Sequence, residues 1–345
     1  MTGTTAAPVR ELPVSPWHAV GPRARACRRP LLAGVVVAFV AVTLWYGYPT
    51  GRDVITAWVA LLLLAACGGD VRVWARSVVR DWLPLTAVLF AYDRLRGSAD
   101  AFGARLADLP ELANGKPGPE GIDQAHVLPQ LRADEVLFGW LTGGQVPTVW
   151  LQDQLYVRGT VHWYDVLLVP VYMSHFLVPI GLAVFLWIRR YDLYARYAWT
   201  LVTLTLLTLS TYALFPAAPP WMAGYNGYLP EVARVTGEVL RATGGTTVSS
   251  FVQQGEAYSN AVAAIPSLHS GFPAMVLLFT WPLVRPWVRA LLVAYIAAMT
   301  FTLTYGGEHY VVDAFAGWAY AGFAVWVVAR LLSGRRTQDG PPAGP

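Results

Sequence analysis

The sequence is poor in charged residues, in lysine and in cysteine. Charged types make up 13% of the 345 residues, well below the roughly 25% that soluble domains carry, which excludes an ordinary soluble protein. Lysine occurs once, at Lys116, so the basic pI of about 9.1 comes from arginines that flank apolar runs. That placement argues against a surface that follows nucleic-acid phosphates. The two cysteines, Cys27 and Cys67, define neither a disulfide framework nor a metal site, and we expect both to be packing residues.

Long apolar runs make up much of the rest. Hydrophobic types account for 55% of the chain, and the mean hydropathy is +0.43. Since a helix needs about 20 apolar residues to cross a bilayer, the sequence predicts an all-α integral membrane protein with a bundle of about eight transmembrane helices. The second and third predicted spans are the weakest, being short and closely flanked by charge. The predicted spans are 31–48, 53–69, 82–96, 163–188, 195–215, 266–284, 288–305 and 309–332.

The arginines predict the orientation of this bundle. Most of them lie in segments that share one side of an eight-span chain, namely 1–30, 70–81, 189–196, 285–289 and 330–336. Because short basic loops stay in the cytoplasm, we expect a multi-pass protein of the cell membrane with both termini cytoplasmic. Two long segments, about 97–162 and 216–265, then lie on the extracytoplasmic side. We expect them to carry short surface helices near 134–140 and 230–241.

The chain has no internal linker or repeat that would divide it. We therefore expect one membrane domain over residues 31–333. The flanking segments, 1–30 and 334–345, are rich in proline, glycine and arginine, and we expect them to be mobile.

Two segments forty residues apart place ionisable side chains where apolar spans begin, and such groups are usually functional. His269 lies in the first, 266–271, and His309 and Asp313 lie in the second, 305–313. Residues four apart on a helix share a face, so Asp313 can orient the ring of His309 and raise its basicity. We predict His309 as a nucleophile and His269 as the acid that protonates a leaving oxygen. Ser267 is expected to cap a helix whose free N–H groups hold a phosphate.

These segments resemble a known family. Residues 266–269, Pro-Ser-Leu-His, are similar to the PSGH motif of the type 2 phosphatidic acid phosphatase (PAP2) superfamily, and 309–313 resemble the HxxxD end of its third motif. Residues 218–221, Ala-Pro-Pro-Trp, resemble a segment of its inositol phosphorylceramide synthase branch. The resemblance covers about 82–330. It implies a PAP2-like helical core and a lipid phosphotransferase or phosphatase that works through a phosphohistidine without a metal or other cofactor.

The sequence departs from the superfamily pattern at the phosphate-binding cations. Thr302 and Leu303 stand where the third motif normally has Ser-Arg, and the first motif is absent. A phosphodiester, with one charge, needs those cations less than a monoester does. The resemblance therefore favours transfer of a phospho-head-group, such as phosphoinositol, from a phospholipid to a hydroxylated lipid or polyol acceptor. We expect the outer end of the third span to supply positive charge and other substrate contacts; its candidate residues are Tyr92, Asp93, Arg94 and Arg96.

Four further residues are weaker candidates for the site. Asp165 and His162 begin the fourth span on its outer side, His175 lies within that span, and Trp221 ends the Ala-Pro-Pro-Trp segment. Three other functions stay open: a PAP2-type lipid phosphate phosphatase that uses water as acceptor, a metal-dependent membrane enzyme built on His269, His309 and Asp313, and a non-catalytic lipid transporter. The donor, the acceptor and the oligomeric state are not predicted.

Overall fold

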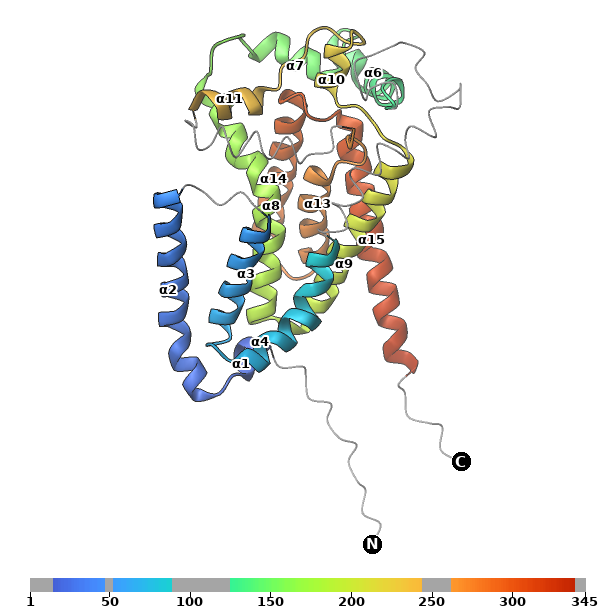
Figure 1. The fold of residues 1–345 in the computed structure, drawn as a ribbon. Helices are drawn as coiled ribbons and strands as arrows, with labels where there is room; N and C mark the ends of the chain where they lie inside the picture. Colours follow the sequence, from blue (N-terminus) through green and yellow to red (C-terminus); the bar gives the residue numbers. More distant parts are fainter. Residues whose placement is uncertain (1–14, 47–51, 89–124, 244–261, 339–345) are drawn as a thin grey trace, which may run out of the picture.

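The computed structural model describes residues 15–46, 52–88, 125–243 and 262–338, and every regular element in these ranges is a helix (Figure 1). The central bundle contains α8 (Trp163–Arg189), α9 (Tyr191–Leu214), α13 (Leu268–Thr280), α14 (Pro286–Tyr305) and α15 (Val311–Gln338). Short helices cover one end of it and form what we call the outer layer: α6 (Leu128–Thr142), α7 (Pro147–Leu155), α10 (Pro220–Tyr225) and α11 (Val235–Thr243). The remaining helices are α1 (Pro16–Ala19), α2 (Pro22–Tyr46), α3 (Arg52–Ala66), α4 (Val71–Ser77) and the π-helix η1 (Val78–Trp82).

The helices confirm an all-α multi-pass membrane protein. Four are long and apolar enough to cross a bilayer: Pro22–Trp45, Tyr191–Leu214, Pro286–Tyr305 and Val311–Leu332. The two halves of α8 pass the same test of length and composition together, so the bent helix is a fifth candidate span among the described residues. The apolar stretches Ala57–Ala66 and Leu268–Thr280 are shorter, and the described part of the third predicted span ends at residue 88. The count of eight spans therefore stays a prediction.

Helix α8 is bent in its middle. Its halves, Trp163–His175 and Leu177–Arg189, meet at 41°. The helix contains Pro170 and Pro179. Proline has no N–H to donate to the carbonyl four residues earlier and its ring crowds that carbonyl, so Pro179 weakens the helix at His175. The bend thus falls beside one of the candidate histidines.

Two element boundaries differ from those that the sequence predicted. Helix α2 begins at Pro22, so the last part of the segment expected to be mobile is helical. Its first turns are rich in arginine and alanine, which favour helix, and arginine stems can extend a span into the headgroup region. Helix α15 likewise continues to Gln338, beyond the predicted end of the membrane domain. Residues 1–14 and 339–345 lie outside the described ranges.

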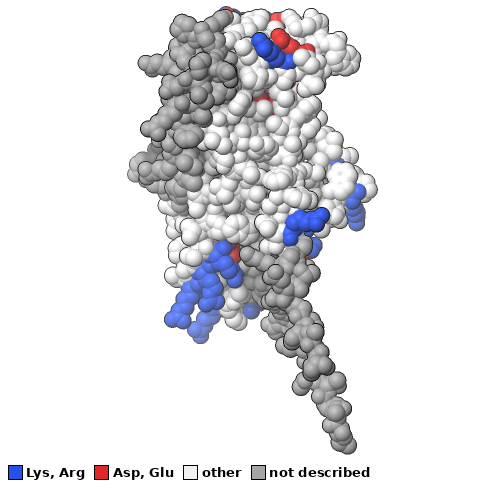
Figure 2. All heavy atoms as spheres, turned by 90° about the vertical axis from the view of Figure 1, so that its right-hand side faces the viewer, with Lys and Arg blue, Asp and Glu red and all other residues white. Residues whose placement is uncertain are grey.

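The surface of the bundle fits a lipid environment. Large apolar side chains are exposed along its helices, among them Leu177, Phe185, Leu206, Leu291 and Phe323. On the face drawn in Figure 2, an uncharged band crosses the middle and arginines gather toward the end away from the outer layer. Such a band would be an aggregation surface in water and is the expected covering in a bilayer.

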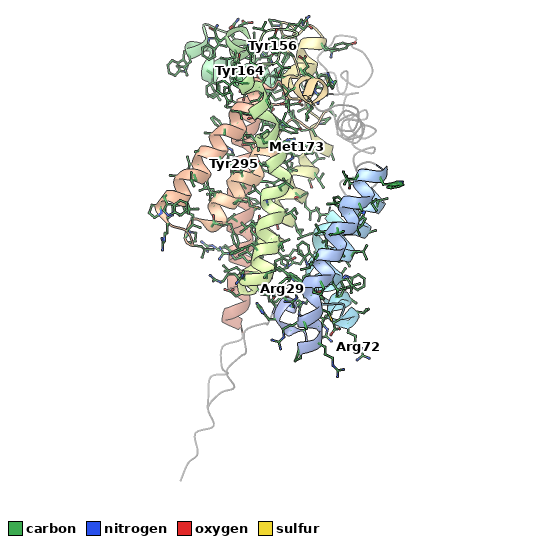
Figure 3. The ribbon with its side chains drawn as sticks, turned by 90° about the vertical axis from the view of Figure 1, so that its left-hand side faces the viewer. Arg29, Arg72, Tyr156, Tyr164, Met173 and Tyr295 are labelled. Atoms are coloured by element: carbon green, nitrogen blue, oxygen red, sulfur yellow. The ribbon has the colours of Figure 1, made fainter. Side chains whose placement is uncertain are left out.

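The two ends of the molecule differ in chemistry. Figure 3 shows Tyr156 and Tyr164 at the end of the outer layer and Arg29 and Arg72 at the opposite end. The loop between α8 and α9, which carries Arg190, also lies at the arginine-rich end because α8 runs from the outer layer to that end. The predicted asymmetry of arginine is therefore a property of the folded chain.

Helices α13 and α15 approach one another through glycine. A Cβ added to Gly317 would lie 2.3 Å from the carbonyl oxygen of Ser267, and one added to Gly271 would lie 3.2 Å from the carbonyl oxygen of Gly317. The backbones meet so closely that side chains do not fit between them, which is how small residues are used where membrane helices cross. Next to this crossing, Trp318 Nε1 donates to Ser270 Oγ at 2.5 Å.

The glycine contact predicts a sharp difference between two substitutions in α15. Gly317→Ala should lower the free energy of unfolding by roughly 1–3 kcal/mol, because the new methyl group overpacks the crossing. Gly322→Ala is the matched control, since its Cβ would meet Leu278 at 3.9 Å, an ordinary contact, and alanine favours helix by about 1 kcal/mol. Thermal unfolding in detergent measures both. Equal stability of the two variants would contradict the close approach.

Candidate functional site

The two predicted histidines meet at the start of the helix pair α13 and α15. Ser267 caps α13 by accepting the N–H of Ser270 at 3.4 Å, which places His269 in the first turn. His309 precedes α15 by two residues. His269 Nδ1 lies 3.1 Å from His309 Nε2, a hydrogen-bond distance. The two imidazoles therefore lie within about two hydrogen-bond lengths, roughly 6 Å, of each other, and they are close enough to hydrogen-bond directly.

Asp313 lies on the other side of the His309 ring. Its carboxylate is fully buried, and Oδ2 is 3.5 Å from His309 Nδ1. The same oxygen accepts the backbone N–H of Tyr310 at 2.9 Å. A neighbouring carboxylate favours the proton on Nδ1, which leaves the lone pair of His309 on Nε2, facing His269. The proton of the 3.1 Å contact then belongs to His269 Nδ1.

Backbone contacts fix the two segments relative to one another. The N–H of Ser267 donates to the carbonyl oxygen of Asp313 at 2.9 Å. The hydroxyl of Tyr212, from α9, donates to the carbonyl oxygen of Pro266 at 2.8 Å. Ser267 is itself fully buried. The predicted cap is therefore also a joint between α13 and α15.

A third histidine packs against this pair. The rings of His175 and His269 are 4.1 Å apart and meet edge to face, and the ring of Tyr172 lies 5.0 Å from that of His269. His175 Nδ1 also contacts the carbonyl oxygen of Tyr172. Since a carbonyl only accepts, this contact places a proton on Nδ1 of His175. The structure thus brings His175 to the site, although the sequence made it one of the weaker candidates.

His162 and Asp165 are used to join helices at the outer layer. Asp165 Oδ2 accepts the N–H of His162 at 2.8 Å, and Oδ1 accepts the hydroxyl of Tyr305 at 2.6 Å. The first contact caps α8 and the second ties α8 to the last residue of α14. His309 follows Tyr305 by four residues in the chain. The contact between Asp165 and Tyr305 therefore helps to fix the segment that carries His309.

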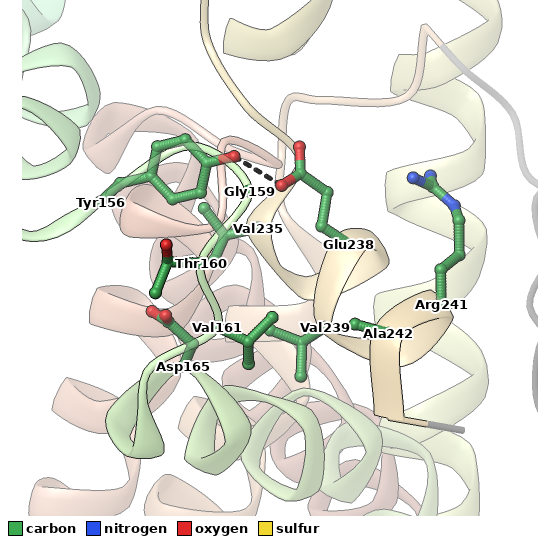
Figure 4. Close-up of a pocket in the computed structure, with 10 residues that line it drawn as sticks. All are labelled: Tyr156, Gly159, Thr160, Val161, Asp165, Val235, Glu238, Val239, Arg241 and Ala242. Atoms are coloured by element: carbon green, nitrogen blue, oxygen red, sulfur yellow. Dashed lines mark hydrogen bonds between the residues drawn. The ribbon is translucent and has the colours of Figure 1, made fainter. Parts of the chain in front are cut away.

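Asp165 also lines a cavity of about 370 Å³ between α8 and α11 (Figure 4). At its rim Tyr156 donates to Glu238 at 2.5 Å. Burial, with the Glu238 carboxylate beside it, raises the pKa of Tyr156 to about 12. The cavity is separate from the pair of histidines, and α8 climbs about 15 Å between Asp165 and His175.

Trp221 contacts the loop that carries His309. The backbone N–H of Trp221 donates to the carbonyl oxygen of Gly307 at 3.0 Å, and the centre of its ring lies 4.7 Å from the guanidinium carbon of Arg234. Arg234 donates to both oxygens of Glu308, at 3.1 and 3.2 Å. The Ala-Pro-Pro-Trp segment is therefore placed against the loop that carries His309.

Several residues that hold this loop were not predicted from the sequence. Besides Arg234, Gln152 of α7 donates to the carbonyl oxygens of Tyr305 and Ala233, at 2.8 and 2.9 Å, and accepts the N–H of Ala233 at 2.9 Å. Asp134 of α6 binds the start of α15. These partners are separated by 74 to 178 residues in the chain, and no local spacing signals such contacts.

The position of the missing superfamily arginine is apolar in the structure. Leu303 is buried in α14, and its carbonyl oxygen accepts the N–H groups of Glu308 and His309. Tyr92, Asp93, Arg94 and Arg96, which were predicted to compensate, lie outside the described residues.

The described part of the chain contains no group of three or more His, Cys, Asp or Glu side chains arranged to hold a metal ion. His309 presents its two ring nitrogens to different partners, Nδ1 to Asp313 and Nε2 to His269. The three predicted residues therefore form a row, in which the imidazole of His309 separates the carboxylate from the second ring.

Comparison with known proteins agrees with the motifs. A family model described as the PAP2 superfamily matches residues 149–327, which include all three histidines of the site. A curated protein, the phosphoinositol dihydroceramide synthase of Bacteroides thetaiotaomicron, is 29% identical over 167 residues, 45% of this chain and 53% of the relative. The chain thus spans about half the length of that relative. No solved structure matches the chain.

Proposed function

Because the chain belongs to the PAP2 superfamily, we propose that it is an integral membrane enzyme that transfers a phospho-head-group from a phospholipid to a hydroxylated acceptor. The observation that carries the proposal is the row formed by Asp313, His309 and His269, with 3.5 Å and 3.1 Å between neighbouring groups. In this row, the nucleophilic Nε2 of His309 and the transferable proton on His269 Nδ1 face each other, so both can act on one phosphate. Similarity to a phosphoinositol dihydroceramide synthase supports phosphoinositol as the head group and a ceramide-type lipid as one acceptor class.

In the first half-reaction, His309 Nε2 attacks phosphorus and the bond to the lipid alkoxide breaks. His269, which enters this step as the imidazolium, gives the proton on its Nδ1 to the leaving oxygen and becomes neutral. The lipid departs as an alcohol, and a phosphohistidine that carries the head group as its single ester remains. The carboxylate of Asp313 stabilises the positive charge that develops on His309. N–H groups at the capped start of α13 face the equatorial oxygens.

In the second half-reaction, His269 takes the proton of an acceptor hydroxyl. The resulting oxygen attacks phosphorus, the P–N bond breaks and His309 is regenerated. Water in place of the alcohol would give a lipid phosphatase by the same steps. Since 3.1 Å leaves no room for phosphorus between the rings, substrate binding must separate them, and the contacts of His175 and Tyr172 guide the ring of His269 as it moves.

The active site is proposed to face the extracytoplasmic side. The histidine pair lies at the starts of α13 and α15, which are the ends of these helices nearer the outer layer (Figure 1), and Arg29 and Arg72 lie at the opposite end of the molecule (Figure 3). Basic short loops remain in the cytoplasm, so both ends of the chain are placed there and the outer layer on the far side.

The first prediction concerns the row formed by Asp313, His309 and His269. His309→Ala should abolish turnover, because it removes the nucleophile. Asp313→Asn should leave a folded protein with kcat lowered by about 100-fold or more, because the imidazole loses its orientation and charge partner. Both are measured as transfer from labelled phosphatidylinositol to a short-chain ceramide, alongside thermal unfolding. Normal turnover by either folded variant would refute the assignment.

The second prediction concerns the substrate charge. With Leu303 in place of an arginine, a dianionic monoester should be processed about tenfold or more slowly than a phosphodiester, since a charged hydrogen bond contributes about 1.5–3 kcal/mol. Leu303→Arg should narrow the difference, whereas Arg94→Ala and Arg96→Ala should slow diester transfer. Purified wild-type protein is assayed with phosphatidylinositol and with phosphatidic acid. Faster release of phosphate from phosphatidic acid would identify a lipid phosphatase instead.

The third prediction concerns orientation. In a background without Cys27 and Cys67, Arg158→Cys should react with a membrane-impermeant maleimide in intact cells, and Arg190→Cys only after permeabilisation. The two side chains are comparably exposed, 68% and 52%, and lie at opposite ends of α8, so exposure alone does not separate them. Labelling in the reverse order would place the site in the cytoplasm.

A further inference from the structure

The start of α15 is held by two carboxylates. The N–H of Tyr310 donates to Asp313, from the same helix, at 2.9 Å. The next two N–H groups, of Val311 and Val312, donate to the two oxygens of Asp134 at 3.0 and 2.9 Å. The first N–H groups of a helix have no acceptor within it, and a Ser, Thr or Asn at the cap would normally serve. Here the residue before Val311 is a tyrosine, and α6 supplies the acceptor from 177 residues away.

Burying the Asp134 carboxylate carries a desolvation penalty. Asp134 and Asp313 are both fully shielded from solvent, and burial raises the pKa of Asp134 to about 7 against the lowering effect of its two backbone donors. The charge of the buried Asp313 carboxylate adds to this rise in the pKa of Asp134, since like charges disfavour ionisation of each other. A neutral cap would satisfy the same N–H groups with a smaller desolvation penalty, so capping alone is a poor explanation for Asp134.

The position of the contact suggests its purpose. Val311 and Val312 lie between His309 and Asp313 in the chain, so their backbone sets where both side chains begin. On the other flank, the outer layer holds Glu308 through Arg234. Fixing both flanks of His309 leaves its ring little freedom except rotation. Asp134 is the element of this arrangement that acts directly on the spacing between imidazole and carboxylate.

We propose that Asp134 is a positioning residue, which sets the spacing between His309 Nδ1 and the Asp313 carboxylate by holding the backbone of Val311 and Val312, and thereby couples the outer-layer helix α6 to the nucleophile. The proposal rests on the proposed function, since it assumes that His309 is the nucleophile. Asp134 itself touches neither phosphate nor acceptor in this account.

Two variants remove the contact in different ways. Asp134→Asn keeps the shape but turns one acceptor oxygen into an N–H donor that faces a backbone N–H. Val311→Pro keeps Asp134 and removes one donor, at the first helical position, where proline is well tolerated. Glu135→Gln, an exposed neighbour in α6, and Val311→Ala are the matched controls. Each full-length variant is assayed for transfer from phosphatidylinositol to a short-chain ceramide, with kcat and KM separated, and for thermal unfolding.

Asp134→Asn and Val311→Pro should lower kcat by about 10- to 100-fold, the usual effect of a small misplacement of a reacting group. KM should stay within about twofold of the wild type, since no substrate contact is lost. In an Asp313→Asn background, Asp134→Asn should have little further effect on kcat, because both substitutions act through the orientation of His309. The controls should behave like wild type.

Three results would overturn the proposal. One is an unchanged kcat in both variants, and another is a full additional loss of kcat in the Asp313→Asn background, which would show independent action. The third is loss of folding in both variants while the controls fold, which would make Asp134 a cap needed for stability only. Failure of the proposed function is distinct, because turnover would then survive in His309→Ala.

Discussion

The site depends on the close approach of α13 and α15. At Gly271 and Gly317 the two backbones are in contact, and one turn beyond this crossing the helices present His269 and Asp313. A side chain at either glycine would separate the helix starts and break the 3.1 Å contact between His269 Nδ1 and His309 Nε2. The hydrogen bond from Ser267 to the carbonyl of Asp313 completes the same joint. The positions of the site residues at the helix starts thus depend on the packing of α13 against α15 at the glycine crossing.

The outer layer is the second support of the site. A buried histidine and carboxylate near a membrane are costly unless protein groups surround them. Short helices provide this surrounding: α7 holds Tyr305 through Gln152, α10 holds Gly307 through Trp221, and α6 holds the start of α15. The loop that carries His309 is therefore held on both sides by hydrogen bonds to residues far from it in sequence. The lipid-facing helices cross the membrane, while these polar contacts fix the position of His309.

Much of this could be predicted from sequence, for a physical reason. Helical periodicity and membrane thickness act locally, so the all-α membrane fold and the pairing of His309 with Asp313 follow from composition and spacing. The proximity of His269 and His309 was inferred from two helix starts on one membrane side, whereas their direct hydrogen bond was not predicted. Asp134, Gln152 and Arg234 could not be found in this way, because their partners are defined only by tertiary packing. The bend of α8 that accompanies His175 has a sequence signal, Pro179, but its consequence needs the neighbouring helices.

In the proposed reaction, His309 carries the phospho-head-group during transfer. The direct test is to mix purified protein with phosphatidylinositol labelled at its phosphate, stop the reaction within a turnover in alkali, where a P–N bond survives, and locate the label by peptide mapping. We predict label on His309, lost on addition of a ceramide acceptor and absent in His309→Ala. Steady transfer with no label on the protein, or label on His269 instead, would contradict the account.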